Sequence, residues 1–208
     1  MLKKTMLAAL ASAVLLPVAS QAATVNLLSN GSFEAGATGW TINDGAVLSG
    51  GAHDGNNYVQ FSFSFDGTGN ATQNITLASA GTYKFGSWVK FQTAQASGNW
   101  DQIQMSIFGP GVNAVAATDP GNNVGASVFN AATGLYETDW FPISGEFSYS
   151  GSGSALVNLN LQNTSPSIGT IAAFDAAYVS PVPLPASALL LIGGLGSLAV
   201  LRRRRKAA

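Results

Sequence analysis

The residues of this chain that could do chemistry are few and mostly acidic. The only histidine, His53, lies in a turn rich in glycine and asparagine, and cysteine is absent from the sequence. A nucleophilic triad needs a base beside an activated hydroxyl or thiol, and a zinc hydrolase needs more nitrogen ligands than one imidazole. Glu137 with Asp139, or with Glu146, could form a glycosidase pair, but acidic loop residues are usually just solvated. We therefore predict that the protein is not an enzyme.

Tryptophan and glutamine side chains indicate a binding surface instead. Trp88 falls on the polar side of an alternating segment, and Trp100 shares parity with Gln102 and Gln104. If the two segments are neighbouring strands, two indole rings stand over amide groups on one sheet surface. Indoles can stack on the C–H faces of sugars, and amides can bond sugar hydroxyls. This pattern predicts a neutral glycan site; the alternative is that each Trp covers core at a sheet edge or under the long loop. Trp40 and Trp140 lie next to turns and are expected to be structural.

Charge separates the middle of the chain from its two ends. All ten acidic residues lie between Glu34 and Asp175, where Lys84 and Lys90 are the only bases, so this region carries a formal charge of −8. Nucleic acid is a poor partner for such a surface, because phosphate binding needs clustered Lys and Arg. Cations and neutral polar ligands suit it better. Without cysteine there is no disulfide framework.

Alternation of apolar and polar residues dominates the stretch between the ends. It is strongest in residues 58–65, 83–91, 103–107 and 157–162, and weaker near 24–28, 71–77, 140–149 and 170–179. A period of two is typical of half-buried strands, and Gly- and Asn-rich turns separate these segments. We predict an all-β, antiparallel β-sandwich of about eight strands over residues 23–180. Residues 109–135 are predicted to form a long loop, either functional or mobile.

The first 22 residues have the pattern of a secretory signal peptide. Lys3 and Lys4 precede an apolar run over residues 6–19, and Ser20-Gln21-Ala22 places small residues at the −3 and −1 positions of a cleavage site. We expect signal peptidase to cut after Ala22. The alternative is a membrane anchor.

Residues 181–208 form a tail of three parts. Val182-Pro183-Leu184-Pro185-Ala186 is a Pro-rich motif, residues 184–201 are apolar, and residues 202–206 are basic. At about 1.5 Å per helical residue the apolar part reaches roughly 27 Å, close to the hydrocarbon thickness of about 30 Å. It is predicted to be a transmembrane helix with the basic end in the cytoplasm. The alternative is a buried core helix with a solvated basic end.

This tail resembles the PEP-CTERM sorting signal of Gram-negative bacteria, in its VPLPA variant. The resemblance covers residues 182–206 and departs from the commonest form at Leu184, where that form has an acidic residue. It implies export and processing at residues 182–186 by an integral-membrane exosortase. It further implies an inner-membrane intermediate, a final place at the cell surface, in the outer envelope or outside the cell, and an association with exopolysaccharide or biofilm matrix.

The stretch between the ends resembles galactose-binding-like and other carbohydrate-binding jelly rolls. The resemblance rests on Asn30-Gly31-Ser32-Phe33-Glu34 with Gly39-Trp40, on residues 73–77 and 81–85, and on residues 173–179. Many of those domains hold a structural calcium that ties the first strand region to the last. By position, the resemblance implies carboxylate ligands at Glu34, Asp54 and Asp175, with carbonyl help near Ser32 and from Asn57. Calcium takes such oxygen ligands; the alternative is that Glu34 and Asp175 bond turn amides.

Three functional classes remain open. The first is an exported, non-catalytic protein whose glycan-binding-like sandwich works within or beside an extracellular polysaccharide. The second is a structural or adhesive matrix protein with the same fold and no glycan site. The third is a glycoside hydrolase.

Overall fold

A computed structural model describes residues 25–64, 67–94, 101–118, 127–163 and 169–183. All of these residues except Pro183 belong to one compact unit that spans Thr24–Val182. They form strands and turns, and the described chain contains no helix long and apolar enough to cross a membrane. The prediction of an all-β domain is confirmed. The predicted signal peptide (1–22) and membrane span (184–201) lie outside the described residues.

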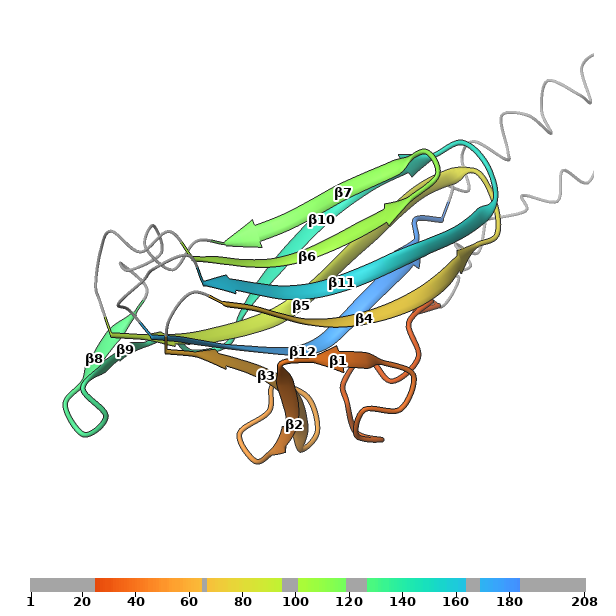
Figure 1. The fold of residues 1–208 in the computed structure, drawn as a ribbon. Helices are drawn as coiled ribbons and strands as arrows, with labels where there is room; N and C mark the ends of the chain where they lie inside the picture. Colours follow the sequence, from red (N-terminus) through yellow and green to blue (C-terminus); the bar gives the residue numbers. More distant parts are fainter. Residues whose placement is uncertain (1–24, 65–66, 95–100, 119–126, 164–168, 184–208) are drawn as a thin grey trace, which may run out of the picture. The chain divides into compact units, whose positions relative to one another are not determined.

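Two antiparallel sheets form the two layers of the sandwich (Figure 1). The five-stranded sheet has the order β1-β4-β11-β6-β7. Its strands are β1 (Thr41–Asn43), β4 (Gly67–Leu77), β6 (Gln102–Gly109), β7 (Val112–Thr118) and β11 (Gly153–Asn163). The seven-stranded sheet has the order β2-β3-β12-β5-β9-β8, and β10 also pairs with β5. Its strands are β2 (Gly45–Ser49), β3 (Asn57–Phe63), β5 (Gly81–Thr93), β8 (Val128–Asn130), β9 (Leu135–Glu137), β10 (Phe141–Tyr149) and β12 (Thr170–Pro181).

The two sheets contribute different side chains to the core between them. The fully buried residues of the seven-stranded sheet include Phe61, Phe85, Phe91 and Phe174, whereas those of the five-stranded sheet include Ile103, Met105, Ile107, Leu159 and Leu161. Phe61 and Phe174 meet edge to face, with ring centroids 5.9 Å apart, a geometry that adds to the gain from burial. Each set has the period-two spacing seen in the sequence, because successive residues of a strand face opposite sides of its sheet.

The structure has more strands than the alternation predicts. β7 occupies residues 112–118, inside the segment expected to be loop, and β8 lies at 128–130. The loop prediction for 109–135 is therefore wrong over these two strands. In β7 the buried residues include Val112 and Ala116, and the exposed ones Val115 and Ala117, so small apolar residues occupy both faces and the alternation is hidden. Conversely, the segment near 24–28, expected to be strand, is irregular at residues 25 and 26 and forms bends from residue 27.

Candidate functional site

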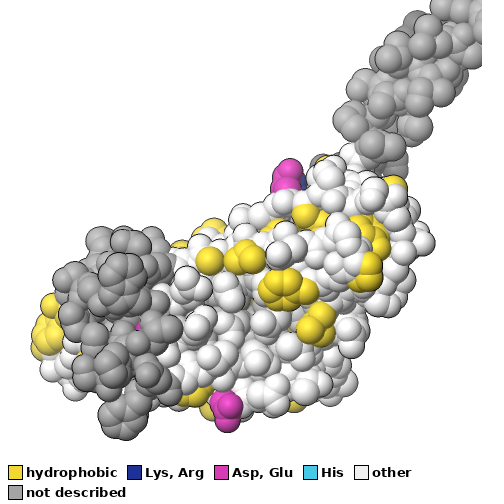
Figure 2. All heavy atoms as spheres, turned by 45° about the horizontal axis from the view of Figure 1, so that its top comes forward, with side chains coloured by type: hydrophobic (Ala, Val, Ile, Leu, Met, Phe, Trp, Pro, Cys, Tyr) yellow, Lys and Arg dark blue, Asp and Glu magenta, His cyan; other side chains and the backbone are white. Residues whose placement is uncertain are grey.

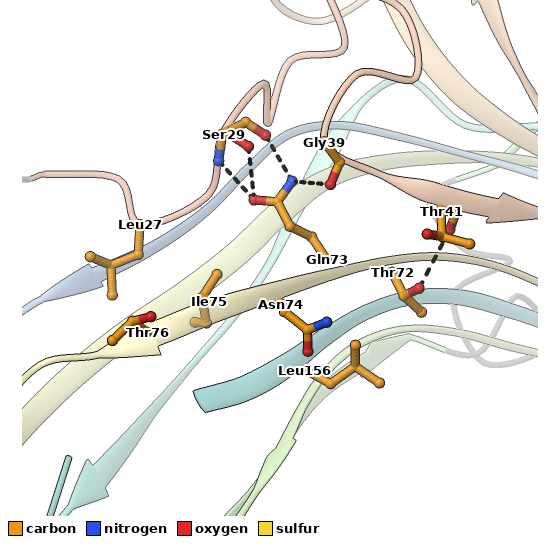
Figure 3. Close-up of a pocket in the computed structure, with 10 residues that line it drawn as sticks. All are labelled: Leu27, Ser29, Gly39, Thr41, Thr72, Gln73, Asn74, Ile75, Thr76 and Leu156. Atoms are coloured by element: carbon orange, nitrogen blue, oxygen red, sulfur yellow. Dashed lines mark hydrogen bonds between the residues drawn. The ribbon is translucent and has the colours of Figure 1, made fainter. Parts of the chain in front are cut away.

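A groove of about 640 Å³ follows one edge of β4. β1 pairs with this edge only at Asn70–Thr72, and among the described residues no strand pairs with the edge beyond that point. The chain around residues 27–39 lies beside it instead and leaves a gap. The residues that line the gap are Leu27, Ser29, Gly39, Thr41, Thr72, Gln73, Asn74, Ile75, Thr76 and Leu156 (Figure 3).

Gln73 holds the two walls of the groove together. Its side chain is 7% exposed and reaches from β4 to the segment that carries Ser29 and Gly39 (Figure 3). The amide oxygen accepts a hydrogen bond from Ser29 N–H at 2.8 Å, and the amide nitrogen donates to Ser29 O at 2.9 Å and Gly39 O at 3.0 Å. Leaving such buried groups unpaired costs about 1–3 kcal/mol each, so the wall is firmly fixed.

The groove opens onto the outward face of the five-stranded sheet, which is uncharged. Asp, Glu, Lys, Arg and His are all absent from β1, β4, β6, β7 and β11. The strand register sets amide and hydroxyl side chains in rows across the sheet: Asn43, Asn70, Asn160 and Gln104 in one, and Thr41, Thr72, Asn158 and Ser106 in the next. Figure 2, which looks toward β6 and β7, shows a mainly neutral surface with acidic side chains toward its margin.

A third row joins the groove to exposed apolar surface. Asn74 of β4 lies opposite Leu156 of β11, which lies opposite Phe108 of β6. Phe108 is 40% exposed and Leu156 36%. We call Asn74, Leu156 and Phe108 the groove row. It offers an amide, an aliphatic side chain and an aromatic ring on one uncharged surface, the combination that suits a ligand with both hydroxyl and C–H faces.

The predicted glycan residues divide between the two sheets. Gln102 and Gln104 lie in β6 on the outward face of the five-stranded sheet, whereas Trp88 lies in β5 of the other sheet. β6 pairs with β11 and β7, not with β5, so the expected surface shared by Trp88 and the glutamines is wrong. Trp88, Gln102 and Gln104 do face outward, as their parity predicts, but parity does not say which strands are neighbours. Trp100 lies outside the described residues.

Trp88 instead belongs to a ring cluster on the seven-stranded sheet, formed by His53, Tyr58, Trp88 and Trp140. The imidazole of His53, an exposed loop residue, stacks on Trp88 with centroids 3.8 Å apart and planes 14° apart. Trp140 meets His53 and Tyr58 edge-on, at 6.4 and 5.8 Å. Since one face of Trp88 is covered by His53, the alternative interpretation of Trp88 as a structural residue fits these contacts better.

Lys90 sits among these rings. Its Nζ lies 4.8 Å from the ring centroid of Tyr58 and 4.8 Å from that of Trp140. Lys90 Nζ and Trp140 Nε1 both donate hydrogen bonds to Gly51 O, at 3.2 and 3.0 Å. Burial lowers the pKa of Lys90, and the nearby carboxylates of Glu137 and Asp175 act against that shift. The ammonium group therefore fastens the turn at Gly51 to the sheet.

Two carboxylates hold the loop over residues 53–57. Asp175 is fully buried; its Oδ2 accepts hydrogen bonds from the N–H groups of His53 and Asp54, both at 2.8 Å, and its Oδ1 accepts one from Ala176 N–H. Burial raises the pKa of Asp175, while these amide donors oppose the rise. A β-bulge between Asp175 and Tyr178, with Ala176 at φ 47°, interrupts β12 at this point.

Glu34 holds the other side of the same loop. Its Oε1 accepts hydrogen bonds from the N–H groups of Asn56 and Asn57, at 2.8 and 2.7 Å, and its backbone oxygen accepts one from Asn57 Nδ2 at 3.3 Å. Gly55 has φ +73°, and a Cβ there would lie 2.5 Å from the Glu34 carboxyl carbon. Only glycine lets the loop close this tightly over Glu34.

These contacts match the amide interpretation of Glu34 and Asp175. Calcium needs six to eight oxygen ligands, but the observed partners of both carboxylates are N–H groups. Asp54 and the half-buried Ser32 lie in the neighbouring loops, yet the described residues contain no group of three or more His, Cys, Asp or Glu side chains placed to hold a metal ion. Calcium binding stays a prediction that this geometry does not favour.

Glu137 and Glu146 lie too far apart to form a glycosidase pair. Glu137 lies opposite Gln92 and Glu146 opposite Lys84 on β5, eight residues or about 26 Å apart along the strand. A glycosidase pair is separated by about 5–10 Å.

Glu137 and the exposed Asp139 do line one hollow of about 420 Å³. Hydrogen bonds from Asn130 and Thr133 hold the pKa of Glu137 below its ordinary value. A general acid needs the opposite shift, so Glu137 is not suited to that role.

Two residues of the predicted processing motif lie within the described chain. Val182 N–H donates to Thr82 O at 2.8 Å, directly after β12 ends at Pro181, and Pro183 is exposed. Leu184, Pro185 and Ala186 lie outside the described residues. The sandwich thus extends to the first residue of the motif.

The fold is similar to that of solved carbohydrate-binding modules. TmCBM61, solved in complex with β-1,4-galactotriose, has a TM-score of 0.52 at 16% identity, over 76% of this chain and 100% of that one. A family 16 carbohydrate-binding module has a TM-score of 0.47 at 17% identity, over 74% and 99%. The CBM22-1 xylan-binding domain of Paenibacillus barcinonensis Xyn10C has 0.46 at 19%, over 77% and 97%. At these identities the likeness shows the fold alone. No protein-family model and no curated protein matches the chain.

Proposed function

We propose that this protein is an exported, non-catalytic binder of a neutral polysaccharide, and that the groove row and the β4 groove form its binding surface. The observation that carries the proposal is the continuity of the groove with an uncharged face of amides, hydroxyls and exposed apolar side chains. A neutral sugar chain needs hydrogen-bond partners and apolar contact without charge. TmCBM61, whose fold is similar, was solved with a neutral oligosaccharide, β-1,4-galactotriose, which supports the choice of ligand class.

Asn158 gives independent support. Its Oδ1 is the one buried side-chain nitrogen or oxygen atom that lacks a hydrogen-bond partner among the described residues. It lies in the row next to the groove row, between Thr72 and Ser106. Buried polar atoms are nearly always paired, and a small rotation of this amide toward the surface would pair it with a ligand hydroxyl.

The test is affinity electrophoresis of the full chain, kept in a detergent without a sugar headgroup. The gels contain β-1,4-galactan, xylan, a soluble β-glucan or, as the acidic control, polygalacturonate. We expect at least one neutral polysaccharide to retard the protein. Asn74→Ala and Phe108→Ala each remove a group from the groove row without opening the core, and we expect each to weaken retention about tenfold, the equivalent of about 1.4 kcal/mol.

Gln162→Ala is the matched control. Gln162 is exposed on the same face of β11, but it lies six residues or about 20 Å from Leu156 along the strand. Retention should be unchanged in this variant. If none of the neutral polysaccharides retards the wild type, or if Asn74→Ala, Phe108→Ala and Gln162→Ala behave alike, the proposed surface is wrong.

The ends of the chain supply the proposed location. We infer that signal peptidase removes residues 1–22 and that the apolar segment 184–201 anchors an intermediate in the inner membrane. An exosortase then acts at residues 182–186. This step delivers the sandwich to the cell surface, the outer envelope or the medium, beside exopolysaccharide or biofilm matrix. The charge pattern and the Pro-rich motif support this course. Mass spectrometry of the native protein tests it: the mature chain should begin at Ala23 and end near Pro185. Intact termini at Met1 and Ala208 would refute it.

Calcium is tested separately by isothermal titration of the metal-free protein. With the loop amides already bonded to Glu34 and Asp175, we expect no heat of binding. Heat that disappears in Asp175→Asn would restore the calcium interpretation.

A structural or adhesive matrix protein is the second candidate. The same uncharged face would then bind a second copy weakly rather than a glycan. Analytical ultracentrifugation of wild type and Phe108→Ala distinguishes the two functions. The adhesive function is favoured if wild type self-associates, Phe108→Ala does not, and no polysaccharide retards the protein.

A further inference from the structure

The seven-stranded sheet has a small hollow of its own on its outward face. Its volume is about 240 Å³, below the range of about 300–1,000 Å³ typical of drug-sized ligands, so it has room for one small ring rather than a chain. It is lined by Tyr58, Gln60, Lys90, Phe91, Gln92, Ile171 and Ala173.

The strand register explains the composition of this hollow. Ala173 of β12 lies between Gln60 of β3 and Lys90 of β5, and Ile171 lies next to Gln92 of β5. The two β12 residues thus form an apolar floor with polar side chains on both sides. An apolar floor between amides can accept the C–H face of a sugar ring while the amides reach its hydroxyls.

Several polar groups at the hollow have spare hydrogen-bonding capacity. Among the described residues, neither the Gln60 amide nor the Tyr58 hydroxyl has a hydrogen-bond partner, although Tyr58 is only 8% exposed. Gln92 uses its nitrogen to bond Glu137 at 3.0 Å, which leaves its oxygen as an acceptor. Lys90 uses one of its three N–H bonds on Gly51 O.

The charges around the hollow argue against an anionic ligand. Lys90 is the one basic side chain that lines it, and both Glu137 and Asp175 act electrostatically on that lysine. Two carboxylates near one ammonium group leave no net positive charge for a uronate or a phosphate.

We propose that this hollow is a second binding site, for a single neutral sugar residue, and that it makes the domain bivalent. The sugar packs on Ile171, over the buried Ala173, and bonds Gln60, Gln92 and the Tyr58 hydroxyl. This inference rests on the proposed function, because bivalency requires that the first site, the β4 groove with the groove row, holds a polysaccharide chain. The two sites lie on the outward faces of opposite sheets. One molecule can therefore hold one polysaccharide chain in the groove and a single sugar residue of a second chain in the hollow. Binding both chains at once cross-links the polysaccharide.

The test uses the full chain in the same detergent and measures binding of galactose, glucose, xylose and galacturonate by ligand-observed NMR. We expect at least one neutral monosaccharide to bind. Gln60→Ala and Tyr58→Phe remove groups without partners among the described residues, so the fold should be unaffected, and each should weaken monosaccharide binding about tenfold. Asn74→Ala, on the other sheet, should leave it unchanged.

Turbidity on mixing with the retained polysaccharide measures cross-linking. Wild type should cross-link, whereas Gln60→Ala and Asn74→Ala should each reduce turbidity, and only Asn74→Ala should weaken retention in the gel. Absence of monosaccharide binding, equal binding by wild type and Gln60→Ala, or preference for galacturonate would overturn the second site. If no variant loses gel retention while Gln60→Ala still binds the monosaccharide less well in NMR, the proposed function is overturned and the second site stands.

Discussion

The two sheets present opposite kinds of outer surface. All five charged strand residues (Lys84, Lys90, Glu137, Glu146 and Asp175) belong to the seven-stranded sheet, and the five-stranded sheet has none. The seven-stranded sheet also carries nearly all the strand aromatics; Phe108 is the one aromatic residue in the strands of the other sheet.

The difference shows two uses of a sheet surface. On the seven-stranded sheet, most of the outward groups are already engaged: carboxylates bond loop amides, and rings pack on one another and on Lys90. That face holds loops in place and retains only a small hollow. On the five-stranded sheet the amides of the innermost row bond one another, and Asn160 and Ser106 are buried. Asn74, Leu156 and Phe108 stay exposed beside the groove and are available for a ligand.

The largest expected effect is on the engaged face, at Asp175. Asp175→Ala removes three hydrogen bonds from backbone amides. Bonds to a charged group contribute about 1.5–3 kcal/mol each, and part of this gain is offset because the variant no longer buries a carboxylate. We expect the free energy of unfolding in urea to fall by about 3 kcal/mol. The exposed Asp139→Ala is the control and should change it little. Equal stability of the two variants would mean that Asp175 does not anchor the loop.

Two lysines on β5 make a matched pair. Lys90→Met loses contact with two rings and with Gly51 O, so we expect a loss of about 1 kcal/mol. Lys84 forms an exposed ion pair with Glu146 at 3.2 Å, and Lys84→Met should cost less than about 0.5 kcal/mol. Thermal unfolding of both variants measures the difference. A larger loss at Lys84 would contradict the assignment of Lys90 as the lysine that holds the turn.

Acid should affect the β8–β9 hairpin through Glu137. Its pKa is held below the ordinary value of 4.5, first by the bond from Asn130 and then by that from Thr133. A depressed carboxyl pKa gives stability that is complete above the unfolded pKa and is lost as pH falls through the folded one. The stability difference between wild type and Glu137→Gln should therefore shrink as pH is lowered below 4.5, as followed by urea unfolding. Glu146→Gln serves as the control. If the stability difference between wild type and Glu137→Gln does not change at low pH, the Glu137 carboxylate is not stabilised by these hydrogen bonds.

The smallest expected effect concerns salt and the five-stranded face. Since none of its strand residues is charged, retention by a neutral polysaccharide should be the same at about 0.05 and 0.5 M NaCl, where charged contacts would be strongly screened. Affinity electrophoresis at the two salt concentrations measures it. A marked fall in retention at high salt would move the binding site away from this face.

The strands with the clearest alternation could be predicted because every second residue faces the core and must be apolar. Val59 and Phe61, Phe85 and Phe91, and Ile103 to Ile107 are buried as their parity requires. β7 could not be found this way, since Ala and Val occupy both of its faces. Phe108 shares parity with Gln102 and Gln104, so the sequence contains the signal that it faces outward with them.

The sequence by itself determined that the chain between its two ends forms β-strands without disulfides, and that Gln102, Gln104 and Trp88 face outward. Only the tertiary structure decided which outward residues share a surface. Strand parity is a local property of two successive residues, whereas sheet order depends on loop paths and on which apolar faces bury each other. That choice put β5 and β6 in different sheets, placed Trp88 against His53, and set Asn74, Leu156 and Phe108 in one row that leads out of the groove.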